Sequence, residues 1–288
     1  MPNVSVIIPT FNRAHLIKES ILSVQSQTLK PTEIIVVDDG STDKTWDILK
    51  NLGFSLSENR NNTLRYIYKE NGGVSSARNI GIELSSSEYI ALLDSDDQWR
   101  ASKLETQISS LEKESFSFRV SHTDEIWIRN GIRVNQHKKH SKNGGDLFEK
   151  CLKMCCISPS SALIHRSVFD DIGSFDENLV ACEDYDFWLR YSAFEGTHFV
   201  DEPLTIKNGG HSDQLSKMYW GMDRFRIYSL EKLLQNENLS RSKYQLTLTE
   251  LIIKLKILMN GSMKRGKKNF TKELNEKIIH FESLLENE

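Results

Sequence analysis

The segment YIALLDSDDQW (residues 89–99) changes abruptly from apolar to acidic side chains. Its apolar part, which ends at Leu93, has the pattern of a short strand that is buried on both faces. Three carboxylates follow within four residues, those of Asp94, Asp96 and Asp97. Carboxylates this close repel one another and are costly to bury. The segment therefore predicts a buried strand that ends either in a ligand site or in an acidic turn before a helix.

The first hundred residues repeat this alternation of a short apolar run and a helical pattern. The apolar runs predict strands at 4–8, 33–37, 64–68 and 88–93. Helical spacing of apolar residues predicts helices over 14–27, from about residue 43, where Ser41 or Thr42 can form the cap, and from residue 74. Strands that alternate with helices form βαβ units, so we expect an α/β fold with a mostly parallel sheet.

Polar side chains follow several of these predicted strands. They are Thr10, Arg13, Asp38, Asp39 and Asp94. In open α/β sheets, ligands bind beyond the carboxyl ends of the strands. The sequence therefore predicts a ligand site at this edge of the sheet.

The second half of the chain is less regular. Residues 117–134 suggest a strand and turn with Asn130 and Gly131 at a hairpin tip, 160–165 a further strand, and a helix begins near Glu183. From residue 223 the pattern is mainly helical, with expected breaks at Gly261 and Gly266. One apolar face contains Leu248, Leu251, Ile252, Leu255 and Leu258, and another contains Leu274, Ile278, Phe281 and Leu285. We expect one domain over 1–222 and a helical appendage over 223–288.

Composition limits the class of protein. Of the 288 residues, 38% are hydrophobic and 27% charged, as in globular proteins, and the net charge of −3 argues against general nucleic-acid binding. No apolar run approaches the roughly 20 residues of a membrane helix, and no secretory signal is visible. The four cysteines, Cys151, Cys155, Cys156 and Cys182, lack the paired spacing of common zinc sites. We expect reduced thiols in a cytoplasmic protein.

Each polar motif has a functional and a structural interpretation. Oxygen ligands at Asp94 and Asp96 can converge on Mg²⁺ or Mn²⁺, or the acids can begin the helix from about Arg100. Asp39 can accept a hydrogen bond from a nucleobase or a ribose, or it can belong to an Asp-Gly turn.

The third motif is NGGVSSARN (residues 71–79). Its glycines allow close approach of the backbone to a ligand, and Arg78 can meet a phosphate. The alternative is a glycine-rich turn beside a solvated arginine. A nicotinamide dehydrogenase is excluded, because no glycine follows the first strand, where such enzymes carry G-x-G-x-x-G.

In combination these motifs resemble a known family. The order VSVIIPTFNR, IIVVDDGSTD, NGGVSSARNIG and YIALLDSDD, followed by CEDYDFWLR (182–190), resembles family 2 glycosyltransferases with the GT-A fold. The resemblance covers about residues 1–215. It implies a nucleotide-binding half over about 1–100, an acceptor-binding half over about 101–222, and a nucleotide-sugar donor.

The resemblance also implies roles for individual residues. Asp184 becomes the general base, although a carboxylate there can also simply favour a helix N-terminus. Asp96 becomes the ligand of Mg²⁺ or Mn²⁺. His211 is a second candidate ligand of the metal, and its alternative is a solvated loop histidine. The donor-binding residues are Pro9, Thr10, Asp38, Asp39, Arg78, Asp94 and Ser95.

The implied reaction is transfer of one sugar, with inversion, to an acceptor hydroxyl in cell-surface polysaccharide or glycoconjugate assembly. The Q-x-x-R-W motif of processive members is missing. UDP is the favoured nucleotide, with GDP and dTDP open, and the acceptor is a saccharide, a lipid-linked saccharide or a protein. The alternative is a catalytically inactive binding module.

The basic stretch 263–272 either touches the inner face of a membrane or is a solvated loop. Trp127 and Trp188 either stack on a sugar or belong to the core, and the C-terminal helices are a candidate homodimer contact.

Overall fold

The computed structural model describes residues 2–57, 62–210 and 218–287. The chain divides into two compact units. Unit 1 comprises Met1–Gly145, Ile157–Val180 and Gly196–Ser212, and unit 2 comprises Asp146–Cys156, Ala181–Glu195 and Asp213–Glu288. The domain boundary that we expected after residue 222 stays a prediction.

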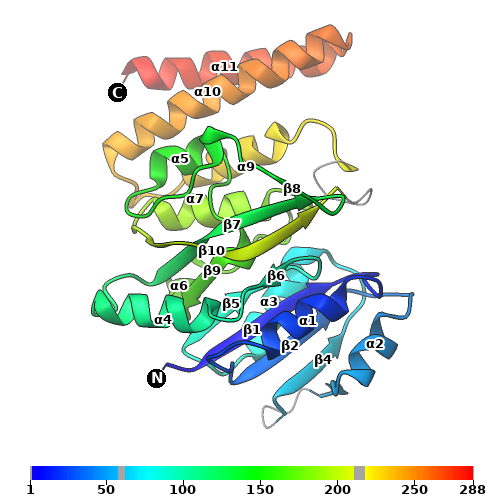
Figure 1. Ribbon diagram of the computed structural model, residues 1–288. Coiled ribbons are helices and arrows are strands. Elements are labelled where there is room, and N and C mark those ends of the chain that lie inside the picture. The colour runs from blue at the N-terminus through cyan, green and yellow to red at the C-terminus, as the bar shows by residue number, and fades with distance from the viewer. Residues whose placement is uncertain (1, 58–61, 211–217, 288) are drawn as a thin grey trace. The chain divides into compact units, whose positions relative to one another are not determined.

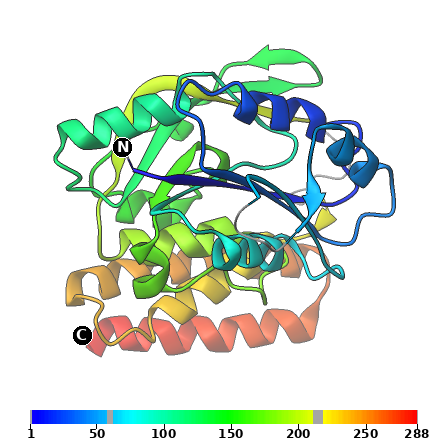
Figure 2. The same cartoon turned by 90° about the horizontal axis from the view of Figure 1, so that it is seen from below.

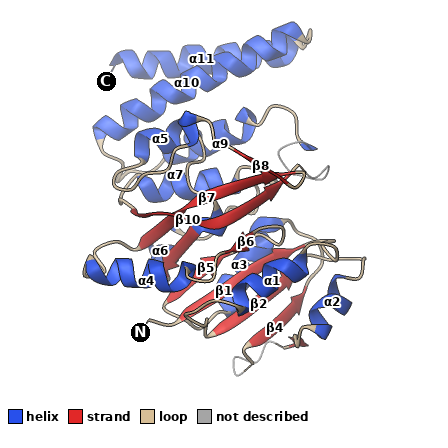
Figure 3. Cartoon of the chain, in the orientation of Figure 1, coloured by secondary structure: helices blue, strands red, loops and turns tan. Residues whose placement is uncertain are grey.

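A single mixed sheet forms the framework of unit 1 (Figure 3). Among the described residues its order is β3-β4-β2-β1-β5-β9-β7-β10-β6, with β8 paired to β7. The pairs among β1 to β5 are parallel, as is β7 with β10, while the pairs that involve β6, β8 and β9 are antiparallel. The strands are β1 (Val4–Thr10), β2 (Glu33–Asp38), β3 (Ser55–Leu56), β4 (Leu64–Tyr68), β5 (Tyr89–Leu92), β6 (Gln98–Trp99), β7 (Val120–Arg129), β8 (Ile132–Val134), β9 (Ala162–His165) and β10 (His198–Gly209).

Helices cover both faces of this sheet because its strands are apolar on both faces. Val6 and Ile8 face a core that includes Ile21 and Leu104, while Ile35 and Val37 of β2 pack with Ala77 on the opposite face. Figure 2 shows dark blue α1 and teal α4 above the sheet and cyan α3 below it. The helices of unit 1 are α1 (Ile17–Gln25), α2 (Thr45–Asn51), α3 (Val74–Leu84), α4 (Lys103–Lys113) and α6 (Ser167–Ile172), with short 3₁₀ turns η1 (Lys138–His140) and η2 (Pro159–Ser161).

Two local expectations had different outcomes. The hairpin between β7 and β8 turns at Asn130 and Gly131, whose φ angles of 50° and 75° suit a two-residue hairpin turn, so that prediction is confirmed. The predicted cap of the second helix is wrong. The Ser41 hydroxyl accepts a hydrogen bond from the Asn12 N–H, and the Asp43 carboxylate accepts the N–H of Thr45, where α2 begins. Ser41 is thus used to join two loops instead of capping the helix.

Unit 2 is helical, with α10 and α11 lying side by side (Figure 1). The predicted apolar face from Leu248 to Leu258 is buried, as are Leu274 and Ile278. The predicted break at Gly261 is wrong, because this glycine lies inside α10 and the turn comes at Gly266, with a φ of 66°. A glycine costs a helix only about 1 kcal/mol, which packing of α10 on α11 offsets. The helices are α5 (Phe148–Lys153), α7 (Glu183–Ser192), α9 (Asp223–Leu233), α10 (Arg241–Lys264) and α11 (Lys268–Asn287).

Two further features agree with the composition. The four cysteines are free thiols. Within the described parts of the chain, we find no helix with the length and apolarity that a membrane crossing requires.

Candidate active site

Asp38 ends β2 in a fully buried position and organises the loop that follows it. Its Oδ1 accepts the Ser41 N–H at 2.7 Å, and its Oδ2 accepts the Tyr66 hydroxyl at 2.7 Å. The Tyr66 ring stacks on Trp46, with 4.4 Å between centroids. Burial and the bond to Asp38 both raise the pKa of Tyr66, which therefore stays a donor. Asp38 thus holds the loop that carries its neighbour Asp39.

Asp39 joins two of the predicted motifs. Its Oδ1 accepts the Lys69 ammonium at 2.6 Å and the Gly72 N–H at 2.9 Å, and its Oδ2 accepts the Gly73 N–H at 2.8 Å. The Asn71 side chain donates to the backbone carbonyl of Asp39 at 2.9 Å. The glycines at 72 and 73 expose backbone N–H groups just before α3, so the carboxylate holds the start of the helix that carries Arg78. Sequence reasoning missed Lys69, although a lysine beside the glycine-rich segment was a visible signal.

The end of β1 is tied to the same loops. Pro9 and Thr10 pair with Val37 and Asp38, and the Asp39 N–H donates to the Thr10 carbonyl at 2.8 Å. The Thr10 hydroxyl is buried and has no hydrogen-bond partner in the described part of the chain. A polar atom in that position is costly unless it is satisfied, which suits a wall of a ligand site.

Asp94 and Arg78 form an ion pair of 2.7 Å at the end of β5. Arg78 is buried, and its guanidinium lies 5.2 Å from the centroid of the Phe175 ring. Burial opposes ionisation of Asp94, but Arg78 and Lys207 outweigh it and lower its pKa. The solvated-arginine alternative is therefore wrong, because Arg78 is an interior residue joined to the acidic strand end.

Asp96 differs from the two acids beside it. Asp97 accepts the Ser160 hydroxyl at 2.6 Å and the Asn208 N–H at 3.0 Å, and burial raises its pKa to about 7. Across the described residues, no side chain donates a hydrogen bond to the Asp96 carboxylate. Burial and the neighbouring Asp94 raise the pKa of Asp96. Of the acidic cluster, which we define as Asp94, Asp96 and Asp97, Asp96 is thus the carboxylate to which no described side chain donates a hydrogen bond, although a backbone N–H does.

Lys207 of β10 is the main countercharge of Asp96 and Asp97, and sequence reasoning missed it. Its ammonium lies 3.5 Å from Asp97 Oδ2. Burial opposes its charge, but Asp97, Glu125, Asp94 and Asp96 outweigh burial and raise the pKa of Lys207. Since Lys207 is more than a hundred residues from the acidic cluster in sequence, only the pairing of β10 with β6 and β7 brings them together.

We expect Lys207→Met to lower the free energy of unfolding by about 1–3 kcal/mol, because it leaves buried carboxylates without their countercharge. Lys207→Arg keeps the charge and should recover most of the loss. Urea denaturation followed by circular dichroism measures both variants. Equal stability of the wild type and Lys207→Met would contradict this role.

The residues present fit a divalent cation. Mg²⁺ and Mn²⁺ prefer carboxylate oxygens, and sites that act on nucleotides often use only one or two carboxylates beside the phosphates. Asp96, with Asp94 nearby, supplies that donor set. In residues 2–57, 62–210 and 218–287, no three His, Cys, Asp or Glu side chains group as a metal site on their own. His211 lies outside the described residues.

Asp184 belongs to unit 2, at the start of α7. Cys182, two residues before Asp184, has a left-handed φ of 62°, and this turn directs the chain into α7. Asp184 Oδ1 accepts the N–H of Tyr185 at 2.7 Å, and Oδ2 accepts the Cys155 thiol at 3.2 Å. Asp184 is half-buried. Trp188, farther along α7, is a buried core residue, as one of its two interpretations predicted.

The structure therefore brings Asp38, Asp39 and the glycine-rich loop together, and it brings Arg78 to Asp94. Both groups lie at the carboxyl edge of the central strands of unit 1. Ser95 is buried beside them, and its carbonyl accepts the Ser20 hydroxyl at 2.9 Å. A mostly parallel α/β sheet with acids at this edge, a glycine-rich loop and an interior arginine is the arrangement expected of a nucleotide-binding α/β protein.

The comparisons with known proteins agree with that class. The family Glycosyl transferase family 2 matches residues 5–173, so the chain belongs to this family. It is 35% identical over 224 residues to an uncharacterized glycosyltransferase of Rickettsia typhi, covering 74% of this chain and 65% of that protein. It is 36% identical over 186 residues to the Escherichia coli UDP-Glc:alpha-D-GlcNAc-diphosphoundecaprenol beta-1,3-glucosyltransferase WfgD, covering 65% of this chain and 68% of that protein.

Among solved structures, Staphylococcus aureus TarS 1–349 in complex with UDP-GlcNAc superposes with a TM-score of 0.75 at 20% identity, covering 97% of this chain and 81% of that chain. This likeness confirms the expected GT-A fold. The match spans just under two thirds of the Rickettsia typhi relative.

Proposed function

We propose that this chain transfers one sugar, with inversion and with a divalent metal, from a UDP-sugar to an acceptor hydroxyl. The observation that carries the proposal is the single edge of unit 1 that gathers Asp39, Arg78 and the acidic cluster. Acids and glycine N–H groups suit the nucleoside, and a buried cation suits a diphosphate. The names of WfgD and of the TarS complex support a UDP-linked donor.

Donor binding divides between the two groups at this edge. Pro9 and Thr10 wall the nucleobase, and Asp39 accepts its N–H, with Asp38 holding the loop. Asp94 and Ser95 would contact the ribose and diphosphate, and Asp96 would hold Mg²⁺ or Mn²⁺. A bound metal ion supplies positive charge that stabilises the leaving diphosphate. Arg78 adds a fixed charge for the same purpose, because its guanidinium is buried and oriented by Asp94.

Asp184 acts as the general base. It removes the proton from the acceptor hydroxyl while that oxygen attacks the anomeric carbon from the face opposite the nucleotide. Attack from that face inverts the configuration, so an α-linked donor gives a β-linked product. The Tyr185 N–H at the start of α7 and the Cys155 thiol both hold the orientation of the carboxylate.

The acceptor is a saccharide, and the WfgD name favours one linked to a lipid diphosphate, as in cell-surface polysaccharide assembly. The basic residues of 263–272 support contact with the anionic cytoplasmic face of a membrane. Lys267 and Arg224 each lie 3.9 Å from the centroid of the Trp220 ring, which fixes part of this stretch within unit 2. The stretch is mostly exposed, but it is not a loop: Met263 and Lys264 end α10, and α11 begins at Lys268. The homodimer contact stays a prediction.

Calorimetric titration with UDP, GDP and dTDP, each with and without Mn²⁺, tests the donor. We expect UDP to bind at least about tenfold more tightly than the other two nucleotides, and only when metal is present. Binding that ignores the metal would remove Asp96 from its role. No binding of any nucleotide would favour the inactive binding module.

A further inference from the structure

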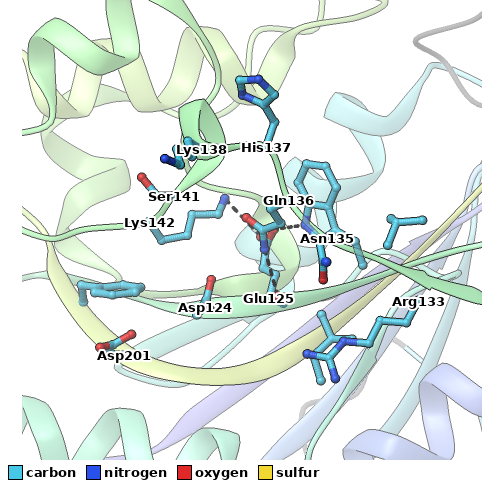
Figure 4. Close-up of a pocket in the computed structure, with 14 residues that line it drawn as sticks. Asp124, Glu125, Arg133, Asn135, Gln136, His137, Lys138, Ser141, Lys142 and Asp201 are labelled. Carbon is cyan, nitrogen blue, oxygen red and sulfur yellow. Dashed lines mark hydrogen bonds and ion pairs between the residues drawn. The ribbon is translucent and has the colours of Figure 1, made fainter.

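A pocket of about 420 Å³ lies in unit 1 beside the β7–β8 hairpin (Figure 4). Its wall is formed by β7, by β8 and the segment that follows it to Lys142, and by Phe199 and Asp201 of β10. None of these residues has a role in donor binding or proton transfer above. The volume falls in the range of about 300–1,000 Å³ that is usual for small-molecule sites.

The floor of the pocket is fixed by Glu125, whose side chain is 1% exposed. Its Oε1 accepts the Ser158 hydroxyl at 2.5 Å and lies 3.4 Å from the Lys142 ammonium. Its Oε2 accepts the Trp127 indole N–H at 2.8 Å. Burial opposes ionisation, but Lys142, Lys207 and these bonds outweigh it and lower the pKa of Glu125 to about 2. The charged carboxylate therefore anchors the floor at all physiological pH values.

The same residue holds the rim in place. Gln136 donates from its side chain to the Glu125 carbonyl at 2.9 Å, and Lys142 reaches back over the floor from the far end of the rim segment (Figure 4). Both ends of the rim segment 135–142 are thus tied to one buried residue. A pocket built in this way loses little conformational entropy when a ligand binds.

The lining selects a neutral ligand with many hydroxyl groups. The lining contains three acids (Asp124, Glu125 and Asp201) and three bases (Arg133, Lys138 and Lys142), so the pocket has no net formal charge that would favour a phosphate or a cation. In the described part of the chain, the side chains of Asp124, Arg133, Asn135 and Asp201 make no hydrogen bond or ion pair, so acceptors and donors are both available.

The apolar part of the lining complements these polar groups. Trp127, Ile126, Val134 and Phe199 contribute apolar surface. The Trp127 ring is itself held by His140, with 5.2 Å between centroids. A sugar ring has an apolar face and polar edges. An aromatic surface with hydrogen-bond donors and acceptors around it is complementary to such a ring.

We propose that this pocket binds a neutral sugar unit of the acceptor. The inference rests on the proposed function for the class of ligand, and it assigns the binding residues independently of the donor site. Lys207 connects the two sites, because β10 pairs Lys207 with Trp127 while its ammonium contacts Asp97 of the acidic cluster. The pocket and the acidic cluster therefore lie in one rigid part of the sheet.

Saturation-transfer NMR with the full chain tests this inference. The probes are the methyl glycosides of glucose, N-acetylglucosamine, galactose and rhamnose, with inorganic phosphate as the charged comparison. We expect at least one glycoside to bind and phosphate not to compete. Ser141→Trp, which fills the pocket from its exposed rim, should weaken binding by about tenfold or more, and Asn135→Ala by about fivefold.

Two variants serve as controls. Ser117→Trp and Asn51→Ala make the same changes at exposed positions outside the pocket and should bind the glycoside normally. UDP affinity is measured for every variant, which separates the two proposals. If the protein bound a glycoside but not UDP, the proposed sugar transfer would be contradicted while the proposed sugar pocket would be supported. Two results would overturn the sugar pocket. In the first, the protein binds UDP but none of the glycosides. In the second, Ser141→Trp and Asn135→Ala bind a glycoside as tightly as the wild type does.

Discussion

Asp184→Asn should reduce the rate of sugar transfer by about 10²–10⁴-fold while UDP affinity changes less than about twofold. Asparagine has nearly the same shape as aspartate and keeps the oxygen that accepts the Tyr185 N–H, so α7 should still begin normally. It cannot take a proton from the acceptor hydroxyl. Initial rates with radiolabelled UDP-sugar, together with calorimetric titration of UDP, measure the two effects separately.

Glu149→Gln is the matched control for this experiment. Glu149 is an exposed carboxylate in the first turn of α5, so it also lies at a helix N-terminus in unit 2. It should transfer sugar at the wild-type rate. If Asp184→Asn turned over as fast as the control, Asp184 would be a helix-start residue only, and the base would have to be another group.

Asp96→Asn should reduce transfer by about 10²–10³-fold and abolish the dependence of UDP affinity on Mn²⁺. The reason lies in the donor set, since Asp96 is the acid of its cluster that no described side chain satisfies. Replacing one oxygen by an amide nitrogen removes the negative charge without changing the size of the side chain. Calorimetric titration of UDP with and without Mn²⁺ measures the effect on UDP affinity, and this measurement does not depend on sugar transfer.

Asp47→Asn provides the comparison for the second variant, because Asp47 is an exposed acid in the first turn of α2. Its Mn²⁺-dependent UDP affinity should equal that of the wild type. An Asp96→Asn protein that still required Mn²⁺ for UDP binding would place the metal on other ligands.

Local patterns predicted the strands and most helices of the first half of the chain, because the spacing of apolar residues along the sequence shows which side chains are buried in each element. They also predicted that the candidate residues gather at one edge of the sheet, since that edge follows from parallel strand order. They failed where a long-range contact decides the outcome. Ser41 bonds to the Asn12 N–H instead of capping α2, and the ion pair of Arg78 with Asp94, which rules out the solvated alternative, could not be read from local patterns.

The contacts that organise the candidate site were also invisible to the sequence. Lys207 reaches the acidic cluster only because β10 runs between β6 and β7. The pocket floor depends on Glu125, which no motif marks and which becomes important only through its burial and four bonded neighbours. Such residues are ordinary in sequence, and their role arises from sheet order.

The bonds at Asp39 have a consequence for redesign of the donor preference. The carboxylate already accepts hydrogen bonds from Lys69, Gly72 and Gly73, so in the proposed donor site a nucleobase shares oxygens that hold the start of α3 in place. Exchanging Asp39 to suit another base would also release the helix that carries Arg78. An engineer who wants a different nucleotide should therefore vary the Pro9–Thr10 wall and leave position 39 as an acceptor.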